Sequence, residues 1–394
     1  MNLNTQARAA LDAALNLTTQ RHGGAPGVVA MATDREGNFY EGASGTRELG
    51  QNTPMTTDSV FAIFSTTKAL TGTCVMQLVE EGRISLGDPA GKYVPEIDEL
   101  QVLDGFDGQP RTRAPRRKIT INDLMLHTSG LSYEFFSADD LKFRTAKGIP
   151  TIVACNFDSI RTVLQHEPGA AWSYGVSIDW LGRIVEQQRG QRLGAVMAER
   201  IFGPLGMKDI GFGLSDSMKA RRVTIHDRAS DGKLTPLPDL VLPDPPPMDM
   251  GGHGLYATVG EYMKFIRMIL NDGAGPHGRV LQADTVRAMV ADGLSAMGLS
   301  AGGWTTSIPS LSNNGEFFPG TPKGWAYTFM TNRERTPSGR PAHSLMWAGL
   351  ANCYYWIDRA SGIGGYWATQ ILPFQDSSSY PGFVEFETAI YHHR

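Results

Sequence analysis

The sequence predicts an α+β protein whose antiparallel sheet is built from both ends of the chain, with a mainly helical lobe inserted between the two parts. Strand-like runs lie near the two ends, at residues 27–45 and 324–372, whereas helical patterns dominate the middle. A sheet assembled from distant segments leaves the residues between them to form a separate layer or lobe. We therefore expect a mixed domain from residues 1–82 and 251–394 and a mainly helical domain from residues 83–250.

The N-terminal part is predicted to be a helix followed by a β-hairpin. Residues 5–21 carry apolar side chains at helical spacing, and the segment from Gly24 to Pro26 ends the pattern. Two apolar runs, 27–32 and 39–45, flank a polar turn that contains Gly37. This arrangement is typical of an antiparallel hairpin.

The middle of the chain is predicted to be mostly helical, with two excursions. A short helix is expected within residues 119–131, and residues 139–202 read as helices with breaks at glycine and proline. Residues 98–118 are expected to form a polar excursion. The Pro-rich residues 235–247 are expected to form a long surface loop, because proline fits neither a helix interior nor a central strand.

The C-terminal part supplies the remaining strands. A helix is expected from Val259 to Leu270, and strand-like runs follow at residues 324–330, 343–357 and 362–372. The last stretch, residues 380–392, reads as a closing helix with one apolar face.

The composition is that of an ordinary globular protein. The chain has 394 residues, of which 41% are hydrophobic, and its formal net charge is −4. The basic run from Arg111 to Lys118 is isolated, so we expect a solvated loop and no nucleic-acid partner. No stretch reaches the roughly 18 apolar residues of a membrane span, and the N-terminus lacks the pattern of a secretory signal.

Cysteine use adds to this picture. Cys74, Cys155 and Cys353 are sparse and far apart, which fits neither a disulfide framework nor a metal site. We therefore expect a cytoplasmic protein with no cofactor, no metal and no membrane partner. The sequence leaves the oligomeric state open.

A Ser-x-x-Lys motif formed by Ser65 and Lys68 is the first candidate for catalysis. It lies in an apolar run that reads as a buried helix ending at Gly82. On a helix, positions i and i+3 share a face, so the two side chains are expected within hydrogen-bond distance. A serine hydroxyl becomes a nucleophile when a neighbouring base takes its proton, and burial can lower the pKa of a lysine enough for that task. The same spacing also occurs in helices with a capping serine and a surface lysine.

Two further segments carry residues suited to acyl transfer. Tyr174 follows a Pro-Gly turn in an aromatic loop just before a predicted helix, where it could pass a proton to or from a nearby lysine. The run from Trp347 to Gly349 places small residues inside a predicted strand, a pattern that often marks the close approach of a ligand or backbone. Each segment alone is more typical of ordinary core packing.

Other residues are interpreted as structural. Gly298-Leu-Ser300-Ala-Gly302 matches the Gly-x-Ser-x-Gly nucleophile elbow, but the motif requires a buried strand before it and a helix after it, and neither is predicted here. His127 and His253 are isolated histidines, which more often have a structural role. Asp88 and Asp179 are interpreted as helix-start or ion-pair residues.

Together, Ser65-x-x-Lys68, Tyr174 and Trp347-Ala348-Gly349 occur in an order that resembles the serine β-lactamase and penicillin-binding-protein superfamily. The sequence is most similar to the family VIII carboxylesterases, which are related to class C β-lactamases. The resemblance runs over nearly the whole chain and implies a β-lactamase/transpeptidase-like fold. It also implies that Ser65 is the acylated nucleophile, that Lys68 and Tyr174 share acid–base work, and that the N–H groups of Ser65 and Leu350 form an oxyanion hole.

The sequence departs from the β-lactamase pattern at two motifs. Val176 occupies the position of the Asn that follows the motif tyrosine, and Trp347 and Ala348 replace the Lys and Thr of a Lys-Thr-Gly motif. Loss of that cation weakens the case for an anionic substrate, whereas an indole favours neutral, apolar esters. Tyr133 and Phe136 are expected to add aromatic walls to the substrate pocket.

The sequence therefore predicts a serine carboxylesterase that acts on short-chain esters, with a small-molecule ester as its partner. An acyltransferase or weak β-lactamase on the same fold is the alternative within the enzymes. A catalytically silent ligand-binding protein is the alternative from another class.

Overall fold

A seven-stranded antiparallel sheet joins the two ends of the chain and confirms the predicted fold class. The structure, a computed structural model, describes residues 3–393. The strand order is β12-β13-β14-β15-β16-β1-β2, and the N-terminal hairpin joins the C-terminal strands where Val29 pairs with Ala368. The strands are β1 (Gly27–Thr33), β2 (Asn38–Gly45), β12 (Lys323–Trp325), β13 (Met330–Asn332), β14 (Leu345–Gly349), β15 (Cys353–Asp358) and β16 (Ile363–Ala368).

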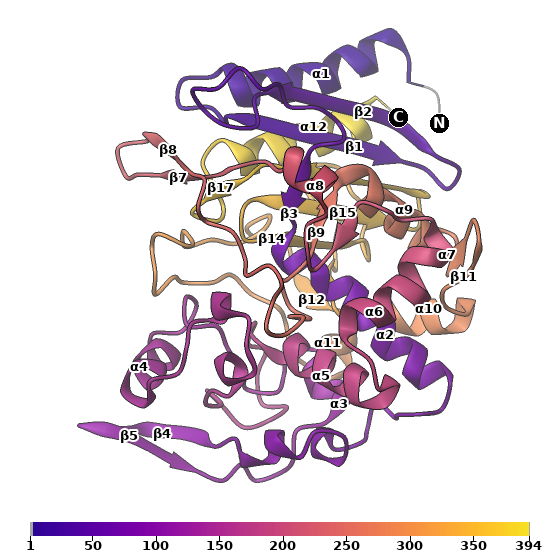
Figure 1. Cartoon of the computed structure of the whole chain (residues 1–394). Helices are drawn as coiled ribbons and strands as arrows, with labels where there is room; N and C mark the ends of the chain where they lie inside the picture. Colours follow the sequence, from indigo (N-terminus) through magenta and orange to yellow (C-terminus); the bar gives the residue numbers. More distant parts are fainter. Residues whose placement is uncertain (1–2, 394) are drawn as a thin grey trace.

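Helices cover both faces of this sheet, which explains why its central strands are apolar throughout. Side chains alternate along β15, so Tyr354 stacks on Phe383 of α12 (Ser379–His392), whereas Tyr355 contacts Tyr262 of α9 (Val259–Leu270). Helix α1 (Thr5–Gln20) packs beside α12, and both lie on the outer face of the sheet (Figure 1). The other face carries α9 and leads to the remainder of the helices.

The buried helix α2 (Thr67–Glu80) lies between the sheet and the helices of the lower part of Figure 1, where it packs against α5 (Ser177–Arg189). The other α-helices are α3 (Ile121–Met125), α4 (Ala138–Lys147), α6 (Leu193–Met197), α7 (Gly203–Leu205), α8 (Asp216–Ala220), α10 (Ala283–Met289) and α11 (Gly293–Ala296). Short turns of 3₁₀ or π type are η1 (Phe64–Thr66), η2 (Ala90–Lys92), η3 (Pro95–Glu99), η4 (Ile152–Ala154), η5 (Phe157–Ile160) and η6 (Ala198–Phe202).

Short strands tie loops to the main layers. They are β3 (Val60–Ala62), β6 (Ile210–Gly211) and β9 (Tyr256–Thr258) in one sheet, β7 (Ile225–Arg228), β8 (Leu234–Leu237) and β17 (Ile371–Leu372) in a second, and β10 (Ala274–Gly275) with β11 (Gly278–Arg279) in a third. Strands β6 and β7 thus pair with segments outside residues 83–250. The division into two domains at these residues stays a prediction.

The polar excursion predicted over residues 98–118 has regular secondary structure, which was not predicted. This segment contains an antiparallel hairpin, β4 (Val102–Asp107) and β5 (Gln109–Arg113), with Gly108 at its tip in the left-handed region. Most of its side chains are exposed or half-buried, so the strands lack the apolar alternation by which strands are recognised in a sequence.

Several predicted boundaries also need correction. The run 343–357 is two strands, β14 and β15, joined by a tight turn, and the run 324–330 covers parts of β12 and β13. Residues 148–176 contain only short 3₁₀ turns, although a mostly helical segment was expected there. The Pro-rich segment 235–247 begins as the edge strand β8, where proline is tolerated.

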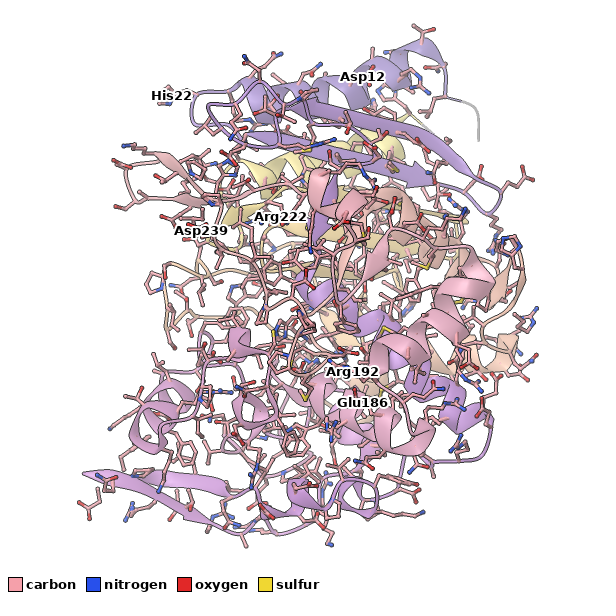
Figure 2. All side chains as sticks on the ribbon, viewed as in Figure 1. Asp12, His22, Glu186, Arg192, Arg222 and Asp239 are labelled. Atoms are coloured by element: carbon pink, nitrogen blue, oxygen red, sulfur yellow. The ribbon has the colours of Figure 1, made fainter. Side chains whose placement is uncertain are left out.

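Charged side chains are concentrated on the outside of the molecule. Asp12, His22 and Asp239 are exposed, and they lie at the periphery of the view in Figure 2. Across residues 3–393, none of the helices combines the length and the apolar character that a membrane crossing requires.

Candidate active site

Ser65 lies where the chain turns from the short strand β3 into helix α2. It occupies the short turn η1, and the preceding Phe64 has a positive φ of 42°. A non-glycine residue in this region is strained and usually has a packing or functional reason. The hydroxyl of Ser65 reaches a cavity on one side and Lys68 on the other.

Lys68 is fully buried and makes three polar contacts. Its Nζ lies 3.2 Å from Ser65 Oγ, 2.8 Å from Tyr133 OH and 2.8 Å from the carbonyl oxygen of Gly252. The predicted hydrogen bond between Ser65 and Lys68 is thus confirmed. The contacts to Tyr133 and Gly252 were not predicted.

The three partners suit both protonation states of Lys68. The carbonyl oxygen of Gly252 can only accept, so Lys68 always donates one N–H to it. A neutral amine can give its second N–H to Tyr133 and direct its lone pair at the Ser65 hydroxyl. The ammonium form can donate a third N–H to Ser65 Oγ. A proton can therefore move between Ser65 and Lys68 without any rearrangement of the amine.

Burial gives Lys68 the properties of a base near neutral pH. Desolvation disfavours the charged amine and lowers its pKa to about 7, and the negative charge of Asp179 opposes this decrease. A lysine with an ordinary pKa would be protonated at neutral pH and could not accept a proton.

Tyr174 meets the same serine from the loop before α5. Its hydroxyl hydrogen-bonds with Ser65 and accepts a hydrogen bond of 2.9 Å from Nε1 of Trp347. Lys68 Nζ lies 4.7 Å from the centre of the Tyr174 ring. Burial raises the pKa of Tyr174, so the neutral phenol is the resting form. The structure therefore brings Ser65, Lys68 and Tyr174 together.

Strand β14 approaches Ser65 closely at Gly349. A Cβ atom added to this glycine would lie 2.4 Å from the carbonyl oxygen of Ile63, a distance that no real side chain tolerates. The absence of a side chain lets the end of β14 lie against the backbone that precedes Ser65. Leu350, the next residue, consequently lines the cavity beside Ser65.

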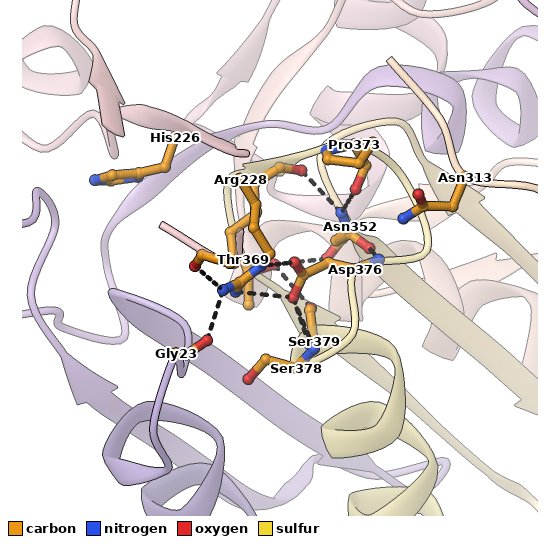
Figure 3. Close-up of polar contacts among 12 residues, drawn as sticks. Gly23, His226, Arg228, Asn313, Asn352, Thr369, Pro373, Asp376, Ser378 and Ser379 are labelled. Carbon is orange, nitrogen blue, oxygen red and sulfur yellow. Dashed lines mark hydrogen bonds and ion pairs between the residues drawn. The ribbon is translucent and has the colours of Figure 1, made fainter. Parts of the chain in front are cut away.

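Asn352 fixes the turn that follows Leu350. It has a positive φ of 63°, its N–H donates to Gly349, and its side-chain amide donates to the carbonyls of Ile371 and Pro373. Its Oδ1 accepts from the N–H of Asp376 (Figure 3). These bonds hold the end of β14 rigidly at the site.

A cavity of about 370 Å³ opens over Ser65. Its walls combine aromatic rings with small polar and glycine residues, and none of its lining residues carries a charge: Ser65, Ser132, Phe135, Phe136, Trp172, Ser173, Tyr174, Ser300, Gly302, Gly303, Trp304, Thr305, Trp347, Ala348, Gly349, Leu350 and Phe374. Such a lining favours apolar, uncharged ligands.

Most residues that the sequence singled out for binding lie at this cavity, with one exception. Phe136, Trp347, Gly349 and Leu350 line it. Tyr133, expected to form part of the wall, is buried behind it and accepts the hydrogen bond from Lys68. The sequence could not predict its contact with Lys68, because an aromatic residue shortly after Gly130 carries no information about its distant partners.

Ser300 lies in the cavity wall but lacks the surroundings of a nucleophile. Its Oγ accepts a hydrogen bond from Arg333, and its loop follows the short helix α11 and precedes no helix.

The two histidines are buried beside the site. His127 contacts the Tyr174 ring, His253 contacts Cys155, and burial lowers the pKa of both imidazoles, so both are neutral.

Sequence reasoning missed Asn352 and also Gly252, whose carbonyl oxygen accepts a hydrogen bond from Lys68. The pair Gly251-Gly252 was a usable signal, because adjacent glycines often permit a close backbone approach. Asn352 offered none, because its role depends on contacts with the distant residues 371–376.

Known proteins are similar to this chain over two thirds or more of its length. The Beta-lactamase family profile matches residues 9–384. The lovastatin esterase of Penicillium rubens is 31% identical over 369 residues, which cover 88% of this chain and 89% of that protein. The monacolin J acid methylbutanoyltransferase of Aspergillus terreus is 33% identical over 276 residues, which cover 67% and 66%.

Solved structures show the same architecture. The LovD6 mutant of simvastatin synthase (LovD) from Aspergillus terreus superimposes with a TM-score of 0.83 at 28% identity and covers 98% of this chain and 95% of that one. The relatives and neighbours thus include both hydrolases and acyltransferases.

Proposed function

The chain belongs to the Beta-lactamase family and has the β-lactamase fold of acyl-transfer enzymes, and from this premise we propose that it is a serine carboxylesterase that hydrolyses short, uncharged esters. The observation that carries the proposal is the hydrogen-bonded group of Ser65, Lys68 and Tyr174 at the base of an uncharged aromatic cavity. Its reaction passes through an acyl-enzyme on Ser65.

In the first half of the reaction, the ester carbonyl lies over Ser65 with its oxygen toward the N–H groups of Ser65 and Leu350. Neutral Lys68 takes the proton of the Ser65 hydroxyl while Oγ attacks the carbonyl carbon. The two N–H groups stabilise the negative oxygen of the tetrahedral intermediate. When the intermediate collapses, the alcohol leaves with a proton passed from Lys68 through Tyr174.

In the second half, water takes the place of the alcohol. Tyr174 and Lys68 accept its proton as it attacks the acyl carbon, and the carboxylic acid leaves as Ser65 regains its proton. Tyr174 is suited to this relay because its hydroxyl contacts Ser65, while Nε1 of Trp347 donates to the same oxygen.

Acyl transfer to an alcohol is the second candidate function. It differs only in the acceptor, because an alcohol that enters the cavity in place of water would give a new ester. The similarity to the Aspergillus terreus methylbutanoyltransferase favours this candidate. Product analysis in the presence of added alcohols separates the two, since a transferase would convert most of the acyl group into the new ester.

The cavity predicts a strong preference for neutral acyl groups. We expect kcat/KM for nitrophenyl butyrate to exceed that for the nitrophenyl hemiester of succinate by about tenfold or more, because an unpaired carboxylate loses its hydration in an uncharged cavity. Spectrophotometric release of nitrophenol measures both rates, and nitrocefin should be a poor substrate. Equal rates for the two esters, or nitrocefin as the best substrate, would contradict the proposal.

A further inference from the structure

Asp179 is a buried carboxylate that the reaction described above does not use. It lies in the first turn of α5, five residues after Tyr174, and its side chain is fully shielded from solvent. Its Oδ1 accepts a hydrogen bond of 2.7 Å from the N–H of Gly252. Its Oδ2 has no hydrogen-bond partner in residues 3–393. A buried carboxylate with an unused oxygen is costly, which calls for a functional reason.

Gly252 connects this carboxylate to the base. Its N–H donates to Asp179, and its carbonyl oxygen accepts from Lys68 Nζ. The glycine also has no room for a side chain, because an added Cβ would lie 2.5 Å from Oδ2 of Asp179. The position of Asp179 therefore fixes the backbone to which Lys68 donates. One residue thus links a buried negative group to the amine that must gain and lose a proton.

Lys68 is the cation with the larger effect on Asp179, because the other one, Arg144, is paired with the carboxylates of Asp140 and Glu134. The titratable and charged groups that face the pair from the packed elements are His127, Tyr133, Tyr174, Cys155, His253 and Arg144. Burial lowers the pKa of His253 to about 3, so its ring is neutral although Nδ1 lies 3.8 Å from Oδ1 of Asp179. Burial raises the pKa of the tyrosines and of Cys155, which also stay neutral.

The two charges stabilise each other. Desolvation raises the pKa of Asp179, and the positive charge of Lys68 acts against that increase. In return, the carboxylate raises the proton affinity of Lys68 above the value that burial alone would give. Since both groups are buried, this attraction is weakly screened by solvent.

We infer that Asp179 is a positioning residue for the base: its carboxylate holds Gly252 in place and supplies the negative charge that stabilises the ammonium formed on Lys68. The inference rests on the proposed function. During attack, the O–H bond of Ser65 breaks and an N–H bond forms on Lys68, so a positive charge appears that the carboxylate of Asp179 attracts across Gly252. When the alcohol leaves, the proton departs with it and this attraction disappears. Asp179 itself neither gains nor loses a proton.

The substitution Asp179→Asn tests this role, because an amide oxygen can still accept from the N–H of Gly252 while the charge is lost. The rate at which a fluorophosphonate probe labels Ser65 is measured against pH by mass spectrometry. In the native protein this rate should fall as pH drops through the pKa of Lys68. This low-pH decrease is the acid limb of the pH profile. Without the carboxylate, Lys68 binds its proton less tightly, so the midpoint of the acid limb should move to lower pH by about one unit. The plateau rate should fall about tenfold or more, because the ammonium is less stable.

Glu387→Gln is the matched control. Glu387 is a fully buried carboxylate paired with Arg340 at 3.0 Å, and it lies on α12 at the outer face of the sheet. Its substitution can lower the melting temperature but should leave the acid limb of the labelling rate unchanged. Asp179→Ser, smaller and also neutral, is a second variant and should move the limb in the same direction as Asp179→Asn.

The outcomes separate the inference from the proposed function. If Ser65 is labelled in the native protein, and the acid limb of the folded Asp179 variants is unchanged or lies at higher pH, the role of Asp179 is overturned. The proposed function is then unaffected. If neither variant folds, Asp179 has a purely structural role, and the inference that it positions the base is overturned as well. Absence of labelling and of ester turnover in the native protein would instead contradict the proposed function.

Discussion

Replacement of Lys68 by methionine is expected to lower kcat for a short nitrophenyl ester by about 10³-fold, because the Ser65 hydroxyl loses the base that accepts its proton. Methionine keeps an unbranched side chain that can fill the buried site. The carbonyl oxygen of Gly252 and the hydroxyl of Tyr133 lose their partner, so the melting temperature should fall by a few degrees while the protein stays folded. Steady-state kinetics and circular dichroism measure the two effects.

Lys264→Met is the control for this substitution. Lys264 lies on α9, where its Nζ contacts Gly206 and Glu261 and touches no residue of the site. Its replacement should leave kcat within about twofold. A Lys68→Met protein that keeps more than a tenth of the native activity would show that another group acts as the base.

Replacement of Gly349 by alanine is expected to lower kcat by about 10²-fold or more and to reduce stability by about 1–3 kcal/mol. The added Cβ would meet the carbonyl oxygen of Ile63 at 2.4 Å, so β14 must move away from the turn that carries Ser65. This movement displaces the N–H of Leu350 from the place where the oxyanion forms. Hydrolysis rates and thermal unfolding test the prediction.

The matched control is Gly260→Ala. Gly260 lies in α9, and an added Cβ would find its nearest neighbours at 3.9 Å. Alanine is the better helix former, so this change should raise stability by about 0.5–1 kcal/mol and leave hydrolysis unchanged. Near-native kcat in Gly349→Ala would contradict the placement of the oxyanion hole at the end of β14.

The sequence correctly predicts helices and strands that bury either one face or nearly all of their side chains. The hairpin of β1 and β2, the helix α9 and the closing helix α12 all lie where their apolar patterns indicate. The hairpin of β4 and β5 could not be predicted, because its mostly exposed side chains have no core face. The turn between β14 and β15 was missed because apolar residues continue through Leu350 and Ala351 with no polar interruption before Asn352.

In the candidate site, too, some features could be predicted from the sequence and others could not. Ser65 and Lys68 are adjacent on one element, so their spacing alone predicts their contact. Tyr174 and Trp347 meet only in the fold, and the resemblance to a family, not the local pattern, brought them together in the prediction. The contacts of Tyr133, Gly252 and Asp179 join helices α2 and α5 to two separate loops, and no single segment of the sequence contains the information that pairs them.

The proposal that an acyl-enzyme forms on Ser65 is tested most directly by mass spectrometry of protein quenched within seconds of mixing with excess nitrophenyl butyrate. We expect a butyryl group on the peptide that contains Ser65, its disappearance as substrate is exhausted, and no such group in Ser65→Ala, which should also lack turnover. A butyryl group on Ser300, or full hydrolysis by Ser65→Ala, would contradict it.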